Sequence, residues 1–267
     1  TITVTAEGDN RWNAYVDGGA GNDTIIVDAP TASINAGAGS DTITLRAETV
    51  HDVDAGEGND TVTLIGDWDR PNLEGDFRLS GGNDSLSIEN WTGSLSTFAD
   101  FRGGSGNDVF VGRDVERANN TYDAFHGDDG QDVITGGSAD EYFDGGADAD
   151  TIDGGGGDDV LYGGAGSDVI VGGAGGDTIT GGEGIDSLTG GPGQDIFVFS
   201  EESTVDLAGD VVTDFTPGSG GDLLDFRPLL SDLGYTGADP FGDNWLGLEQ
   251  EGSDLKVILI YGNAANM

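Results

Sequence analysis

The sequence predicts an all-β fold, a right-handed parallel β-roll or β-helix solenoid with a C-terminal capping segment. Three observations predict it. Eight nine-residue units follow one another without insertion over residues 127–198, a related motif recurs at longer intervals upstream, and the periodicity stops after Val198. We therefore expect an irregular solenoid over residues 1–126, a regular roll over residues 127–198 and a cap over residues 199–267.

The eight units of the roll share one pattern. They read GDDGQDVIT, GGSADEYFD, GGADADTID, GGGGDDVLY, GGAGSDVIV, GGAGGDTIT, GGEGIDSLT and GGPGQDIFV. The first position is Gly, the sixth is a carboxylate and the eighth is a large apolar residue. A disordered Gly-rich linker has no reason to repeat that apolar position. No unit can bury one apolar residue alone, so two units form an 18-residue coil and the coils stack.

The turn of each unit has the chemistry of a cation site. Glycine adopts positive φ at little cost, so G-G-x-G can turn tightly and direct its carbonyls to one place. The sixth-position carboxylate adds a charged oxygen, and a set made only of oxygens suits Ca²⁺. The glycines that we expect at these sites are Gly155, Gly157, Gly164, Gly166, Gly173, Gly175, Gly182, Gly184, Gly191 and Gly193.

The upstream motif has a longer period. Its Asp residues are separated by intervals of 18, 19, 24, 24 and 24 residues, and each is followed by a short β-type segment. One edge of the solenoid would carry Asp23, Asp41, Asp60, Asp84, Asp108, Asp132, Asp150, Asp168 and Asp186. The second edge would begin at Glu141 and continue through Asp159, Asp177 and Asp195. Eight gaps on the first edge and three on the second predict at most about eleven ions, fewer where Glu141, Ala139 or Asp148 departs from the pattern.

Each upstream coil is predicted to contain two strands. The strands after the motif Asp are expected at Thr24–Val27, Thr42–Leu45 and Thr61–Ile65. Those before the next glycine turn are expected at Ser33–Ala36, Val50–Ala55, Asp76–Ser80 and Tyr122–His126. The loops between them, Ile65–Phe77, Glu89–Phe101 and Gly112–Thr121, lack the G-x-G-x-D pattern. Calcium turns are therefore expected on one edge only over residues 1–126.

The nonapeptide resembles G-G-x-G-x-D-x-U-x, the hemolysin-type calcium-binding repeat of the RTX family. The resemblance implies several Ca²⁺ ions as cofactors and a bacterial, extracellular protein that leaves the cell through a type I secretion exporter. It also implies that the chain folds on binding calcium after export. Because family members carry such repeats as an attached part, the module is expected to be non-enzymatic, with any catalytic domain upstream of Thr1.

The C-terminal residues look like the segment that closes such arrays. Asp210–Phe215 and Gly221–Phe226 carry this likeness, and an open solenoid end needs a cap over its sheet edges and core. We expect the cap at Val205–Phe226 and a further strand at Leu255–Tyr261. The chain then ends abruptly at Met267, where relatives continue to a secretion signal, which indicates a piece of a longer protein.

Composition narrows the possible partners. The formal net charge is −42, with 51 acidic residues against 9 Lys and Arg, which disfavours nucleic acid and anionic membranes. The longest apolar run, Val257–Tyr261, is too short to span a bilayer, so no transmembrane segment is expected. There is no cysteine, and metal ions can supply the cross-links that disulfides give other secreted proteins.

An active site is not visible in the sequence. The two histidines, His51 and His126, are not part of H-E-x-x-H, and no G-x-S-x-G is present. The alternative to a calcium-folded module is an adhesin-like module that binds a cell-surface glycan. In that case Trp68 and Trp91, each flanked by polar residues in a wide loop, would stack on sugar rings. The competing interpretation is that both tryptophans cover the apolar ends of strands.

Overall fold

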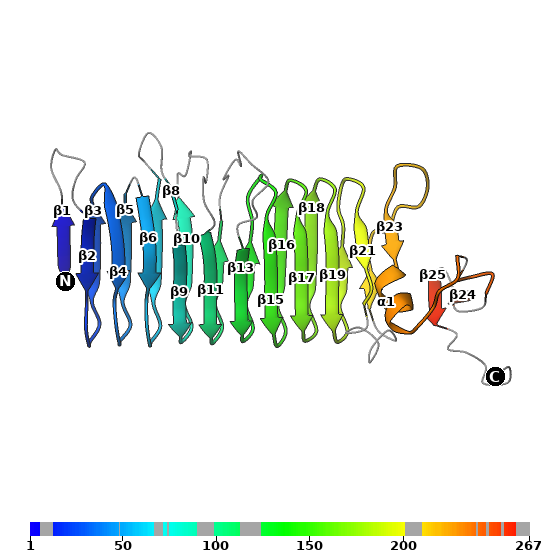
Figure 1. Ribbon diagram of the computed structural model, residues 1–267, viewed down its shortest axis with the longest axis horizontal. Helices are drawn as coiled ribbons and strands as arrows, with labels where there is room; N and C mark the ends of the chain where they lie inside the picture. Colours follow the sequence, from blue (N-terminus) through cyan, green and yellow to red (C-terminus); the bar gives the residue numbers. More distant parts are fainter. Residues whose placement is uncertain are drawn as a thin grey trace.

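The computed structural model describes residues 1–5, 13–47, 49–66, 72–73, 75–89, 99–112, 124–200, 210–238, 240–243, 246–251 and 254–259. Over these residues the chain is a long stack of coils that runs from the N-terminus at one end to a small C-terminal hairpin at the other (Figure 1). Two parallel β-sheets line the stack. The all-β, parallel β-roll solenoid predicted from the sequence is confirmed.

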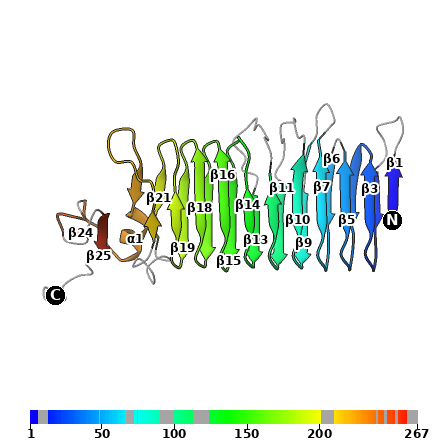
Figure 2. The same cartoon turned by 180° about the vertical axis from the view of Figure 1, so that it is seen from behind.

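The first sheet has eleven strands, and Figure 2 shows β3, β5 and β7 following one another along its length. In spatial order these strands are β1 (Ile2–Thr5), β3 (Thr24–Asp28), β5 (Thr42–Arg46), β7 (Thr61–Ile65), β10 (Ser85–Glu89), β12 (Val109–Val111), β14 (Val133–Thr135), β16 (Thr151–Gly156), β18 (Val169–Ala174), β20 (Ser187–Thr189) and β22 (Val211–Val212).

The second sheet has twelve strands and lies on the opposite side of each coil. In order they are β2 (Asn13–Asp17), β4 (Thr31–Asn35), β6 (Thr49–Asp54), β9 (Gly75–Gly81), β11 (Ala99–Ser105), β13 (Ala124–Asp129), β15 (Tyr142–Ala147), β17 (Val160–Ala165), β19 (Thr178–Glu183), β21 (Ile196–Val198) and β23 (Leu223–Asp225), with β8 (Asn72–Leu73) beside β6.

The strand register follows the repeat length. In the roll, Ile152 pairs with Ile170, so one coil is two nonapeptides, as predicted. Upstream, Leu86 pairs with Phe110, 24 residues on, so this coil is six residues longer than a coil of the roll. The predicted strands after each motif Asp begin where β3, β5 and β7 begin. The strands before the glycine turns are placed less well, since β4 starts two residues before Ser33.

The core is a single column of side chains between the two sheets. Each coil contributes its eighth-position residue, and Ile152, Leu161 and Ile170 are completely buried. On the second sheet of the wider coils phenylalanines take this place, and the rings of Phe101 and Phe125 stack with centroids 4.5 Å apart. Alternation of buried and exposed residues along each strand therefore directs every second side chain into the same column.

The sheets do not end at Val198. Strands β22 and β23 add one further coil, which the sequence analysis placed in the cap. Beyond it, helix α1 (Arg227–Asp232) buries Leu229 against the core, and Phe199 stacks on Phe226. Strands β24 (Leu246–Glu251) and β25 (Asp254–Leu259) form an antiparallel hairpin, close to the strand expected from Leu255. The three-part division of the chain stays a prediction.

Candidate metal centre

The sixth-position carboxylates form a ladder along the first edge. In each coil the backbone N–H of the carboxylate residue donates to Oδ1 of its equivalent in the next coil. The first step joins Asp23 N to Asp41 Oδ1 at 2.7 Å, and the last joins Asp186 N to Asp210 Oδ1 at 3.0 Å. The intermediate steps pass through Asp60, Asp84, Asp108, Asp132, Asp150 and Asp168. The structure thus brings together all the residues expected on this edge.

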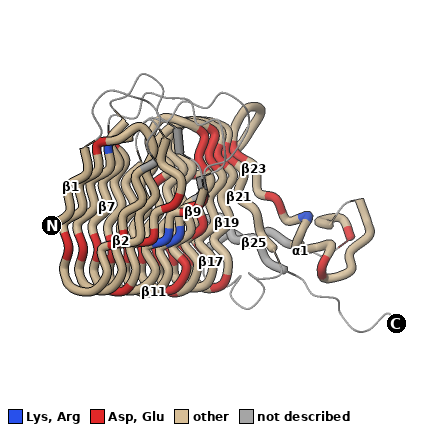
Figure 3. Tube along the Cα trace, turned by 60° about the vertical axis from the view of Figure 1, so that its left-hand side comes forward, with Lys and Arg blue, Asp and Glu red and all other residues tan. Residues whose placement is uncertain are grey.

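A second ladder runs along the opposite edge over fewer coils. It begins with Glu141 N, which donates to Asp159 Oδ1 at 2.7 Å, and continues through Asp177 and Asp195 to Asp222 at 3.1 Å. Figure 3 shows the acidic residues at the turns of one edge along the stack and, nearer β21 and β23, at the other. Glu141, which departs from the Asp of the pattern, donates its backbone N–H to the ladder as the Asp residues do.

In most of these carboxylates the second oxygen is buried and accepts no hydrogen bond. This holds for ten described residues, namely Asp41, Asp60, Asp84, Asp108, Asp132, Asp150, Asp159, Asp168, Asp177 and Asp195. A buried anionic oxygen without a partner is strongly unfavourable, so native proteins neutralise it with a cation or a proton. Asp23 differs, because its side chain is 20% exposed and lies 3.7 Å from the N-terminal amino group.

A first-position glycine leaves a small space beside each such oxygen in the roll. A Cβ on Gly145 would lie 2.4 Å from Asp150 Oδ2 and 2.5 Å from the carbonyl oxygen of Gly163 in the next coil. For Gly163 the same two distances, to Asp168 Oδ2 and to the Gly181 oxygen, are 2.3 and 2.4 Å. A carboxylate oxygen and a carbonyl oxygen therefore face one point. Such hard oxygen donors fit Ca²⁺.

The glycines whose carbonyl oxygens are expected to bind the cation lie at the second and fourth positions of the turns. Gly155 and Gly157 have φ of 94° and 120°, and their carbonyl oxygens approach Gly173 and Gly175 of the next coil so closely that a Cβ there would lie 2.1 and 1.7 Å away. The carbonyls of Gly164, Gly166, Gly173 and Gly175 approach Gly182, Gly184, Gly191 and Gly193 in the same way. All ten expected glycines thus line the two edges.

Among the described residues, three that are not glycine adopt the left-handed conformation that these turns require. Asp148 stands at the fourth position with φ of 74°, and Asp128 stands at the second position with φ of 69°. Ser80, with φ of 79°, replaces the second glycine in the upstream turn where the leading Gly pair is lost. A side chain in this region costs about 1 kcal/mol, so these are the weaker turns of the array.

Burial raises the pKa of several ladder carboxyls. Loss of solvation is the largest cause, and it raises the pKa of Asp150 to about 8 and that of Asp84 and Asp177 to about 7. Neighbouring ladder carboxylates raise these values further, whereas the backbone hydrogen bond opposes them. A bound cation would remove this penalty, because the opposite charge favours the ionised form.

Two ladder residues were missed from the sequence. Asp210 and Asp222 extend the ladders beyond Asp186 and Asp195. The available signal was the D-x-U pattern of Asp210–Val212 and Asp222–Leu224 together with the interval of 24 residues from Asp186 to Asp210, which also occurs upstream. At this end of the stack, backbone N–H groups take the place of a cation at the carboxylate oxygens. Asp222 Oδ2 accepts the Thr216 N–H, and Asp214 accepts the N–H groups of Gly190 and Gly191.

The other predicted residues do not join the ladders. His126 lies on the outer face of β13, where its hydrogen bond to Asp144 raises its pKa, and His51 lies on β6. Trp68 and Trp91 lie outside the described residues. Within the described part of the chain, no three His, Cys, Asp or Glu residues gather in a metal-binding cluster. Such a cluster is not expected here, because backbone carbonyls would supply many of the oxygen ligands at each ladder step. No helix there is long and apolar enough to cross a membrane.

The calcium-binding nonapeptide repeat of the RTX family, in four copies, matches the chain. The matched residues are 15–29, 100–114, 122–152, 135–170, 144–179 and 171–201. These ranges cover the regular roll and parts of the irregular coils before it. No curated protein matches the chain.

Proposed function

This chain carries an RTX calcium-binding repeat region between residues 15 and 201, and we propose that it is a module that folds when Ca²⁺ binds along its two carboxylate ladders. The buried second oxygens of the ladder carboxylates carry this proposal. No protein hydrogen-bond donor reaches these oxygens, and without a cation their burial raises the pKa of the carboxyls. Calcium supplies the missing partner for all of them at once.

The proposed ligands are the ladder carboxylates and the glycine carbonyls that face them. In the roll these are Asp132, Asp150, Asp159, Asp168, Asp177, Asp186 and Asp195 together with the ten glycines from Gly155 to Gly193 that line the turns. Upstream, Asp23, Asp41, Asp60, Asp84 and Asp108 would serve the single edge. The limit of about eleven ions counts only the steps up to Asp186 and Asp195, and Asp210 and Asp222 add one step to each ladder.

The coupling to folding follows from charge. A chain with net charge −42 repels itself, and each coil contributes only a narrow core. Because Ca²⁺ binds the folded coils and not the unfolded chain, its binding energy becomes folding energy. This supports a protein that stays unfolded where calcium is scarce, leaves a bacterial cell through a type I exporter and folds outside. We propose no catalytic role for these residues.

A calcium titration followed by far-ultraviolet circular dichroism tests the proposal. The β signal is expected to be weak in EDTA and to rise cooperatively with calcium, while isothermal titration gives the number of ions. Magnesium at the same concentrations is the control, since it prefers a stricter octahedral geometry and keeps its waters. An equally folded chain in EDTA and in millimolar calcium would overturn the coupling of binding to folding.

A further inference from the structure

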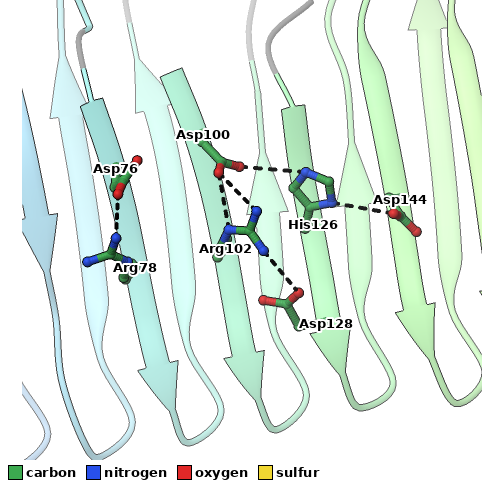
Figure 4. A network of polar contacts seen from close by, with 7 residues as sticks. All are labelled: Asp76, Arg78, Asp100, Arg102, His126, Asp128 and Asp144. Atoms are coloured by element: carbon green, nitrogen blue, oxygen red, sulfur yellow. Dashed lines mark hydrogen bonds and ion pairs between the residues drawn. The ribbon is translucent and has the colours of Figure 1, made fainter. Parts of the chain in front are cut away.

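A network of charged side chains lies on the outer face of the second sheet, away from the ladders. It contains Asp76 and Arg78 on β9, Asp100 and Arg102 on β11, His126 and Asp128 on β13, and Asp144 on β15. The register places Arg78, Arg102, His126 and Asp144 in one row, one residue in each coil. Figure 4 shows this row with its contacts.

Several contacts of this network join different coils. Arg102 Nη1 lies 3.9 Å from Asp128 Oδ1, which connects β11 to β13. The His126 imidazole connects β13 to both neighbours, with Nε2 3.6 Å from Asp100 Oδ1 and Nδ1 3.4 Å from Asp144 Oδ2. Within one coil, Arg102 Nε donates to Asp100 Oδ2 at 3.1 Å, and Arg78 pairs with Asp76.

Polar contacts continue the connection toward the N-terminus. The backbone N–H of Asp76 donates to Asp52 Oδ1 at 3.2 Å, and Ser80 Oγ lies 3.4 Å from Asp54 Oδ1, so β9 is also tied to β6. The chain has only nine Lys and Arg and two His, and three of these eleven cationic or titratable residues occupy consecutive coils.

The position of the network matches the start of the second ladder. That ladder begins at Glu141, directly before β15, and the network ends at Asp144, within β15. Upstream of Glu141 the loops of these coils lack the G-x-G-x-D pattern, so calcium can tie them together on one edge only. The network therefore occupies the coils that carry a single row of carboxylate turns.

We propose that the Asp76–Asp144 network is a metal-free cross-link that replaces the second calcium edge in coils β9 to β13 and joins them to the roll at His126 and Asp144. The proposal rests on calcium serving as the cross-link elsewhere, as proposed above. The Arg102 guanidinium is its central group, because it faces acidic groups of two coils. Single ion pairs at exposed sites are weak, but a network that spans several coils acts on all of them together.

The experiment compares Arg102→Gln with Arg227→Gln in saturating calcium. The control breaks the pair of Arg227 with Asp225, which lies outside the network. Hydrogen exchange is measured in peptides from β11 and β13 and from β18 to β20. Arg102→Gln is expected to speed exchange in β11 and β13 by roughly fivefold and to leave β18 to β20 unchanged, because the lost contacts stabilise only neighbouring coils. Equal exchange in the two variants would overturn the proposal.

A second measurement separates this role from general surface electrostatics. Calcium titrations read by exchange should show a higher calcium midpoint for β9 to β13 in Arg102→Gln than in Arg227→Gln. In 1 M NaCl, where charges are screened over about 3 Å, the difference should shrink. An unchanged midpoint contradicts the cross-link even if calcium folds the chain. If the chain folds equally well without calcium, the proposed function is wrong. The comparison of exchange rates between Arg102→Gln and Arg227→Gln at fixed calcium would still test the network.

Discussion

The backbone N–H of Asp132 donates to Oδ1 of Asp150 at 2.8 Å, while Oδ2 of Asp150 is buried and has no donor. One side chain thus performs two tasks, since one oxygen sets the register between coils and the other remains available to a cation. The same division recurs along both ladders. Coil stacking and the proposed calcium binding therefore depend on the same residues.

Replacing Asp150 with Asn should raise the calcium concentration needed to fold the chain by roughly tenfold or more, since loss of groups around a metal commonly costs that much affinity. Without calcium the same change should not destabilise the chain, because Asn keeps the oxygen that accepts the Asp132 N–H and carries no charge that burial would penalise. Asp153→Asn, an exposed change in the same coil, is the control. Circular dichroism during calcium titration measures both, and equal midpoints for the two variants would contradict a ligand role for Asp150.

Replacing Gly163 with Ala should destabilise the calcium-bound roll by about 1–3 kcal/mol, the usual cost of overpacking. The new methyl group would lie 2.3 Å from Asp168 Oδ2, where both the carboxylate and a cation need room. Gly156→Ala is the matched control, because its nearest neighbour would be 3.5 Å away. Urea unfolding in saturating calcium compares them. If both variants lose the same stability, the space beside Oδ2 has no special role.

Replacing Asp148 with Gly should stabilise the chain by about 1 kcal/mol, because Asp148 holds a φ of 74° that glycine adopts without strain. Asp148→Asn is the control for charge, since Asn removes the charge but keeps a Cβ in the left-handed region. Urea unfolding in saturating calcium should rank Gly above Asn and Asn near wild type. A gain as large with Asn would assign the effect to charge repulsion instead.

The pH dependence of the calcium-free chain follows from the raised pKa values. The folded values of about 8 for Asp150 and about 7 for Asp84 and Asp177 exceed the ordinary 3.8. The folded state therefore holds its protons more tightly than the unfolded state. Its stability contribution is fully present below about pH 4 and is lost as the pH rises toward 8.

In EDTA the chain should accordingly be more folded near pH 5 than near pH 8. Saturating calcium should reverse this preference, because protons and calcium compete for the same oxygens. Circular dichroism at both pH values, with and without calcium, gives the four measurements. A calcium-free chain that gains structure as the pH rises would contradict the raised pKa values.

Much of the fold was predictable because the repeat encodes it directly. The strands β3, β5 and β7 begin at the residues predicted, since each follows a motif Asp and alternates strictly. Asp210 and Asp222 were not predicted as ladder residues, because the unbroken nine-residue repeat stops before them and Val205 and Pro217 stand where the first glycine of the turn should be. The outer-face network was also beyond prediction. Nothing in the repeat pattern links Arg102, His126 and Asp144, and only the strand register places them in neighbouring coils.

The last prediction concerns the direction of folding. At the C-terminal end Asp214 and Asp222 accept backbone N–H groups with both oxygens, so this closure forms without a metal. Phe199, Phe226 and Leu229 add apolar contacts there, and the adjacent coils carry carboxylates on both edges. Folding in a linear stack starts at its most stable unit and spreads to its neighbours. We therefore expect protection to appear first in β19 to β23 and last in β2 to β6.

Pulsed hydrogen exchange after calcium addition measures this order. Asp214→Ala should slow the appearance of protection along the roll, because it removes the bonds to Gly190 and Gly191. Asp243→Ala is the control, since it breaks a contact with Tyr235 beyond the last coil. Protection that appears first in β2 to β6, or that is delayed equally by both variants, would show that the N-terminal coils organise the fold.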